Sequence, residues 1–70
     1  MSATIIITAN GARHEIPAAL RLDEFLLSVG LQPRLVVVEH NGLALTPGEA
    51  RSAVLATGDV LEIVRIVAGG

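Results

Sequence analysis

The sequence predicts an α+β domain in which one main helix packs on one face of a mixed sheet of four or five strands. Three observations support this fold class: strand-like runs joined by Asn-Gly at residues 10–11 and 41–42, a single amphipathic helical segment, and a run of branched apolar residues near each end of the chain. The 70 residues leave room for one domain only, over residues 1–70, and no repeat or linker divides them.

The first two strands are predicted at about residues 3 to 9 and 12 to 17, on either side of Asn10-Gly11. A type I′ turn requires a positive φ angle at both central residues, and Asn and Gly adopt that conformation at the lowest cost. The "TIIITA" run and the mixed run after it therefore form a β-hairpin.

The helix is predicted in "LRLDEFLLSVG", where four apolar residues have the spacing of one helical face: Leu22, Phe25, Leu26 and Val29. Gly30 stands where a helix commonly ends in a residue with positive φ, and Pro33 prevents the helix from continuing. The helix is therefore expected to end near Val29.

In the second half of the chain, a strand is predicted from about 34 to 40 and a short edge strand at about 43 to 45. One helical turn is predicted near 49 to 53, and a last strand in "VLEIVRIV" follows a turn at Gly58-Asp59. The first and last strands are expected to lie side by side and parallel at the centre of the sheet. Parallel neighbours need a crossover connection, and the hairpin with its following helix supplies the only one available.

Alternation along the strands predicts which face each apolar residue occupies. The helix side should hold Ile5, Ile7, Leu61 and Ile63. The opposite face should hold Ile6, Val64 and Ile66, and a contiguous apolar patch of this kind usually marks a partner surface. Two alternatives stay open: a register error of one residue, which would exchange the faces, and isolated apolar residues on the surface.

Composition argues against several function classes. The net charge of −2, the lack of a basic run and the single aromatic residue, Phe25, argue against nucleic-acid binding. The absence of cysteine excludes a disulfide or a thiolate metal site, so any sulfur chemistry must use another group. The amino end has no signal-peptide pattern or membrane span, which predicts a cytoplasmic protein that does not bind membranes.

No candidate catalytic group stands out. His14 and His40 lack the spacing to carboxylates that a triad or a metal site requires, and both are expected to be surface or structural residues. Without lysine, neither a Schiff base nor a Walker-type phosphate loop can form. The sequence therefore predicts no enzyme, no catalytic residue, no metal site and no cofactor.

The terminal Gly69-Gly70 allows two interpretations. It is either a frayed end or a thin, flexible segment that enters a channel too narrow for side chains. In the second interpretation the reactive group is the Gly70 carboxylate, which is ionised at neutral pH because α-carboxyl groups have pKa values of about 3.3 to 3.7.

The order and spacing of "ANG", "VVVEHNG", "TGDVLEIVRIV" and the final "GG" carry a resemblance over essentially the whole chain. The sequence resembles the sulfur carrier proteins of the ubiquitin-like β-grasp fold, and most closely the carriers of thiamine (thiazole) biosynthesis. Two positions depart from the family: Ala50 stands where an aromatic residue is frequent, and Ala68 where a third glycine is common.

The resemblance implies a sulfur-carrying site at Gly70 and Gly69. An E1-like (ThiF-like) enzyme would adenylate the Gly70 carboxylate with ATP, and a persulfide donor such as a cysteine desulfurase would supply sulfur. The resulting thiocarboxylate would serve a ThiG-like thiazole synthase. Partner contacts are expected at Ile6, Val64, Ile66 and Ala68, with the free protein a monomer.

Three alternatives remain at this point. The chain could be the small subunit of molybdopterin synthase or a tRNA-thiolation carrier, which would share the fold and the chemistry but not the sulfur acceptor. It could be a ubiquitin-like modifier that forms amides on target lysines. It could also be a β-grasp interaction module with an inert tail.

Overall fold

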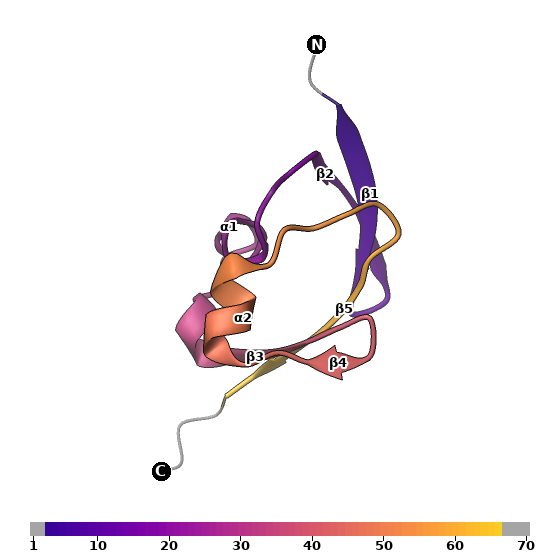
Figure 1. Cartoon of the computed structure of the whole chain (residues 1–70). Coiled ribbons are helices and arrows are strands. Elements are labelled where there is room, and N and C mark those ends of the chain that lie inside the picture. The colour runs from indigo at the N-terminus through magenta and orange to yellow at the C-terminus, as the bar shows by residue number, and fades with distance from the viewer. Residues whose placement is uncertain (1–2, 67–70) are drawn as a thin grey trace.

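The computed structural model describes residues 3–66, which form a five-stranded sheet in the order β2-β1-β5-β3-β4 with the helices to one side of it (Figure 1). The strands are β1 (Thr4–Ala9), β2 (Ala12–Pro17), β3 (Val36–His40), β4 (Leu43–Ala44) and β5 (Val60–Arg65). The helices are α1 (Leu22–Ser28), the 3-10 helix η1 (Pro33–Leu35) and α2 (Pro47–Ser52). The predicted α+β class, with one main helix on a mixed sheet, is confirmed.

Strands β1 and β5 lie side by side and parallel at the centre of the sheet, as the crossover rule predicts. Their ladder is short, with Thr8 opposite Val60 and Ala9 opposite Leu61. On its other edge β5 pairs antiparallel with β3 over five residue pairs, from Val36–Arg65 to His40–Leu61. Strand β5 is therefore bonded to a neighbour on each side.

Both Asn-Gly turns adopt the left-handed conformation that the hairpin prediction requires. The φ angles are 48° at Asn10 and 81° at Gly11, and 51° at Asn41 and 86° at Gly42. A β-branched or bulky residue at these positions would be strained, which is why Asn and Gly occur there.

Helix α1 ends where the sequence predicts, but its last predicted apolar residue is not in the core. Leu22, Phe25 and Leu26 are at most 1% exposed, whereas Val29 is 42% exposed. Gly30 has a φ of 82°, and the chain turns away as the Leu31 N–H donates to the Leu26 carbonyl at 2.9 Å. The helix thus ends directly at Val29, and the helical spacing that placed Val29 on the buried face overestimates how far this residue is buried.

Two elements differ from their predicted bounds. The strand expected from about residue 34 begins at Val36, because Pro33–Leu35 form the 3-10 helix η1. The helical turn expected near 49 to 53 is α2, Pro47–Ser52. It starts earlier because Thr46 and Glu49 form a capping box: the Glu49 N–H donates to Thr46 Oγ1 at 3.2 Å, and the Thr46 N–H donates to Glu49 Oε1 at 2.9 Å.

The core lies between the sheet and the helices. Its buried apolar residues are Ile7, Ala9, Ile16, Leu22, Phe25, Leu26, Val38, Leu55 and Leu61. The predicted faces are confirmed: Ile7 and Leu61 are buried and Ile5 and Ile63 are half-buried against the core, while Ile6, Val64 and Ile66 are exposed. The register alternative is therefore wrong.

Candidate functional site around strand β5

Strand β5 leads directly to the predicted reactive end of the chain. The predicted site residues Ala68, Gly69 and Gly70 lie outside the described residues. The last described contact before them is a hydrogen bond from the Ile66 N–H to the Leu35 carbonyl at 2.8 Å. The residues that position β5 therefore fix the last described part of the chain before the predicted site residues.

The side chain of Asn10 extends the short β1–β5 ladder. The Ile63 N–H donates to Asn10 Oδ1 at 2.7 Å, and Asn10 Nδ2 donates to the Ile63 carbonyl at 3.0 Å. The amide thus bonds to both backbone groups of one β5 residue, as a neighbouring strand would.

Asn41, in the second Asn-Gly turn, holds the start of β5. The Val60 N–H donates to Asn41 Oδ1 at 2.8 Å, and the Asn41 N–H donates to the Val60 carbonyl at 2.8 Å. Asn10 and Asn41 thus have two roles, in their turns and in positioning β5. The second role has no local signal in the sequence, because these partners lie 53 and 19 residues away.

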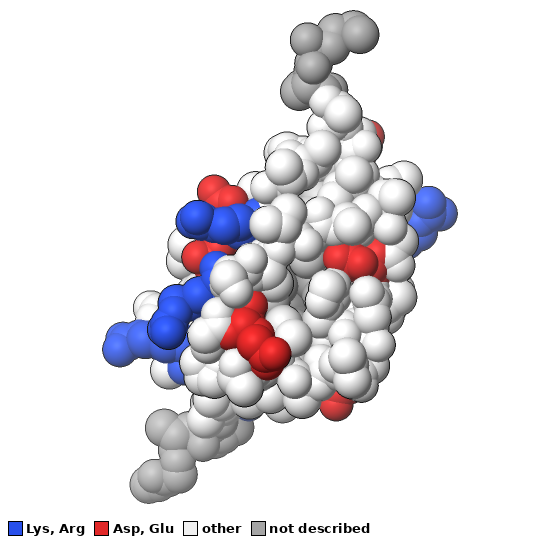
Figure 2. Space-filling view, viewed as in Figure 1, with Lys and Arg blue, Asp and Glu red and all other residues white. Residues whose placement is uncertain are grey.

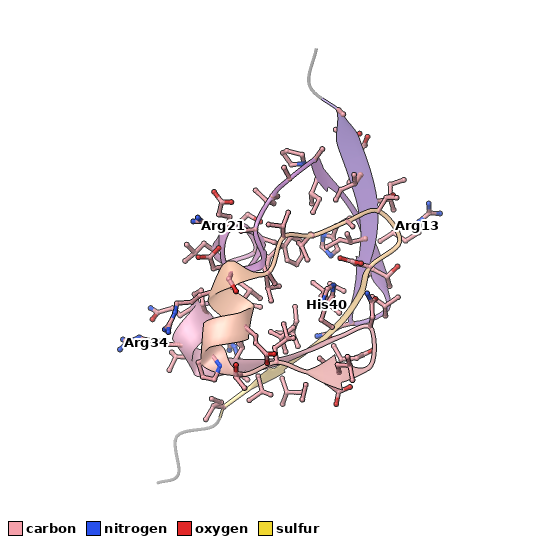
Figure 3. All side chains as sticks on the ribbon, viewed as in Figure 1. Arg13, Arg21, Arg34 and His40 are labelled. Carbon is pink, nitrogen blue, oxygen red and sulfur yellow. The ribbon has the colours of Figure 1, made fainter. Side chains whose placement is uncertain are left out.

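Asp59, immediately before β5, is a buried carboxylate that is 7% exposed and has three hydrogen-bond partners. Asp59 Oδ2 accepts from the Ala56 N–H at 2.8 Å and lies 2.8 Å from His40 Nε2, and Oδ1 accepts from Asn41 Nδ2 at 3.1 Å. Burial alone would raise the pKa of Asp59, but the hydrogen bonds from Ala56, His40 and Asn41 together outweigh it, and the pKa is lowered. His40 (Figure 3) therefore has a structural partner at the start of β5.

We expect Asp59 to make folding sensitive to acid. Because its folded-state pKa lies below the unfolded value of about 3.9, its contribution to stability is fully present above that pH and is lost as the pH falls through the folded pKa. Urea unfolding from about pH 6 to about pH 3 should show a larger loss of stability in the parent than in Asp59→Asn, which has no charge to lose at this position. Equal losses in the two proteins would contradict this assignment.

His14, the other histidine, lies on the core side of β2. Its ring packs edge-on against Phe25, with centroids 5.2 Å apart and an interplanar angle of 82°. Such an edge-to-face contact stabilises the core. The structure thus gives both histidines structural neighbours, as expected.

The exposed sheet face does not form the contiguous patch that alternation predicts. Val64 lies opposite Val37 of β3, and both are exposed. Ile6 instead lies beside the turn before β5, where the Gly58 N–H donates to the Ile6 carbonyl at 2.8 Å. Thr8 lies opposite Val60, so Ile6 lies two residues before this pair and Val64 four residues after it, a separation of about 20 Å along the sheet at about 3.3 Å per residue. The prediction that Ile6 joins Val64 and Ile66 in one patch is therefore wrong.

Two opposed carboxylates divide this face. Glu39 and Glu62 are register partners on β3 and β5, and both side chains are exposed. Like charges directly opposite each other in a sheet are mildly destabilising. The two carboxylates thus separate the apolar residues Val37 and Val64 from the apolar residues Ile6 and Val60. Val37 and Val64 lie at the end of the face that is closer to Ile66.

The described residues contain no group of three or more His, Cys, Asp or Glu side chains placed to hold a metal ion. Nor does any helix in residues 3–66 combine the length and apolar character needed to cross a membrane.

The sheet order, the parallel central pair and the crossing helix define a ubiquitin-like β-grasp fold. A designed protein based on human erythrocytic ubiquitin matches this chain with a TM-score of 0.56 and 23% identity, over 100% of this chain and 98% of that chain. At that identity the likeness concerns the fold alone.

Within this fold class the chain belongs to the ThiS family, whose model matches residues 4–70. The crystal structure of thiamine biosynthesis protein ThiS from Geobacter metallireducens is similar, with a TM-score of 0.77 and 26% identity, over 94% of this chain and 100% of that chain. A thiazole synthase of Magnetococcus marinus is 33% identical over 64 residues, which are 91% of this chain. The match spans only 20% of the length of that synthase.

Proposed function

We propose that this protein is a sulfur carrier for thiazole formation in thiamine biosynthesis, with Gly70 as its carrier residue. The observation that carries the proposal is the match to the ThiS family over residues 4–70, a range that includes both terminal glycines. The similarity to ThiS of Geobacter metallireducens supports the same pathway.

The proposed chemistry needs three steps. A carboxylate oxygen of Gly70 attacks the α-phosphorus of ATP on an E1-like enzyme, and pyrophosphate leaves, which gives an acyl adenylate. The terminal sulfur of a donor persulfide then attacks the acyl carbon and displaces AMP, which forms an acyl disulfide. A thiol reductant cleaves the sulfur–sulfur bond and leaves a thiocarboxylate, so the carrier is a cosubstrate and the catalytic groups belong to its partners.

The second proposed partner is a thiazole synthase, the enzyme on which the carried sulfur would enter the thiazole. The similarity between this chain and part of the Magnetococcus marinus thiazole synthase supports an association between such carriers and the synthase.

Intact-mass measurement tests the carrier function directly. A chain ending at Gly70 is incubated with an E1-like activating enzyme, ATP, a persulfide donor and a thiol reductant, and the expected product has one oxygen replaced by sulfur. Omission of ATP should prevent the exchange. A protein that stays unmodified under all conditions, or that appears only as an amide conjugate of another protein, would overturn the proposal.

The apolar end of the sheet face near Val64 is proposed to contact the activating enzyme. Val64→Asp should weaken that association at least about tenfold, because a charge becomes costly once the partner excludes water from it. The variant should stay folded, since Val64 is 63% exposed.

Ile6→Asp is the matched control, because Ile6 is also exposed but lies at the far end of the face. Calorimetric titration of the activating enzyme should give the parent affinity for this variant. An unchanged affinity for Val64→Asp would remove this surface from the interaction.

A further inference from the structure

A groove of about 340 Å³ opens beside the end of β5, between η1, α2 and β3. Its inner surface is apolar: Leu26 and Val38 belong to the buried core, and Val36, Leu45 and Ala50 pack against that core and are half-buried. The last described residue, Ile66, also lines the groove. A partner seated here would therefore lie next to the segment that follows Ile66.

Two arginines line this groove, and a third lies in an adjoining hollow. Arg34 from η1 and Arg51 from α2 line it directly, and Arg65 lines an adjoining hollow of about 410 Å³ that shares Ile66. In Figure 2 most of the blue side chains lie along the left edge of the molecule, with red ones among them, and one lies on the right edge; Figure 3 places Arg34 on the left and Arg13 on the right. Three of the five arginines in a chain of net charge −2 thus line this groove or the adjoining hollow.

The described part of the chain does not neutralise these cations. Its ion pairs involve Arg21, with Asp23 and Glu24, and His40, with Asp59. Arg34 Nε donates instead to Gln32 Oε1 at 3.3 Å. The carboxylate on α2, Glu49, is bonded through Oε1 to the Thr46 N–H.

We infer that the groove docks an acidic segment of a partner protein. Carboxylates of that segment would pair with Arg34 and Arg51, while an apolar side chain between them would contact Val36, Val38 and Leu45. An apolar floor between separated cations suits a polypeptide with alternating acidic and apolar residues better than a small anion, which would leave the floor in contact with water. The inference depends on the proposed function in one respect: it takes the partner to be a protein that acts on the residues after Ile66.

Titration with a defined peptide, followed by backbone amide NMR, tests the inference. The probe is a short, end-blocked peptide of alternating glutamate and leucine, added to the chain of residues 1–70. Shift changes should concentrate at Arg34, Val36, Leu45, Ala50 and Arg51, and added salt should weaken binding. The double variant Arg34→Gln with Arg51→Gln should bind about tenfold more weakly, as expected for the loss of two exposed ion pairs.

Matched controls separate the charged and apolar contributions. Arg13→Gln removes a cation on the opposite side of the molecule and should leave the affinity unchanged. Versions of the peptide with glutamine for glutamate, or serine for leucine, should each bind more weakly than the probe.

The inference would be overturned if millimolar peptide caused no shift changes, if the changes were centred on the exposed sheet face, or if the glutamine peptide bound as well as the probe. It would also be overturned if inorganic phosphate alone bound the groove and displaced the peptide. Shift changes that depend on protein concentration would indicate self-association instead, and would overturn it too. The sulfur-exchange assay distinguishes this from failure of the proposed function. If the groove is not a docking site, the chain still becomes thiolated but the peptide does not bind; if the carrier function is wrong, the peptide binds but no sulfur is acquired.

Discussion

A chain with one alanine added after Gly70 is expected to lose sulfur acquisition by at least about 100-fold, because reactive groups displaced by a residue no longer meet their partners in a productive geometry. The new carboxylate lies one residue further along, and the alanine methyl group would enter a channel proposed to fit glycine. Intact mass after incubation with the activating enzyme, ATP, the persulfide donor and a thiol reductant measures the effect.

Gly69→Ala provides the graded comparison, since it adds one Cβ but leaves the Gly70 carboxylate in place. Its sulfur acquisition should be slowed by less than that of the extended chain. The core residues lie between Ile7 and Leu61, so both changed proteins should unfold at the parent's urea concentration. Thiolation of the extended chain at the parent rate would exclude Gly70 as the carrier residue.

Phe25→Ala is expected to destabilise the domain by about 3 to 5 kcal/mol, the usual cost of removing a buried phenylalanine. Phe25 is 1% exposed, lies on the buried face of α1, and also contacts the ring of His14, so its removal leaves a cavity and ends an aromatic contact. A domain of this size has little stability to lose, and the variant should be largely unfolded or close to it.

Leu27→Ala on the same helix is the control. Leu27 is 62% exposed, so its truncation should change the free energy of unfolding by less than about 0.5 kcal/mol. Urea unfolding of both variants measures the difference. A loss below about 1 kcal/mol for Phe25→Ala would mean that the ring contributes far less to the core than its burial implies.

Local signals predicted most of the fold. The Asn-Gly turns, the helical spacing of Leu22, Phe25 and Leu26, and the stop at Gly30 each depend on residues close together in the chain, and each was confirmed. The start of α2 also had a local signal, Thr46 with Glu49 three residues later, which the prediction near 49 to 53 overlooked.

The missed features depend on register between distant segments. Alternation correctly assigns Ile6 and Val64 to one face, but only the β1–β5 register reveals the distance between them along the sheet. The bonds from Asn10 and Asn41 to β5 were likewise beyond local reasoning, because the same residues already had a sufficient local explanation in their turns. The groove beside Ile66 arises where η1, α2 and β3 meet, and no single segment encodes it.

The position of β5 also has a consequence for local unfolding. Segments near a chain terminus normally fray first and exchange their amide hydrogens fastest. Here the strand nearest the proposed carrier residue is bonded to β1 and Asn10 on one edge and to β3 on the other, so opening it requires the two halves of the sheet to separate. The amides of β5 should therefore be among the last in the described part of the chain to exchange, which hydrogen-exchange measurements can check.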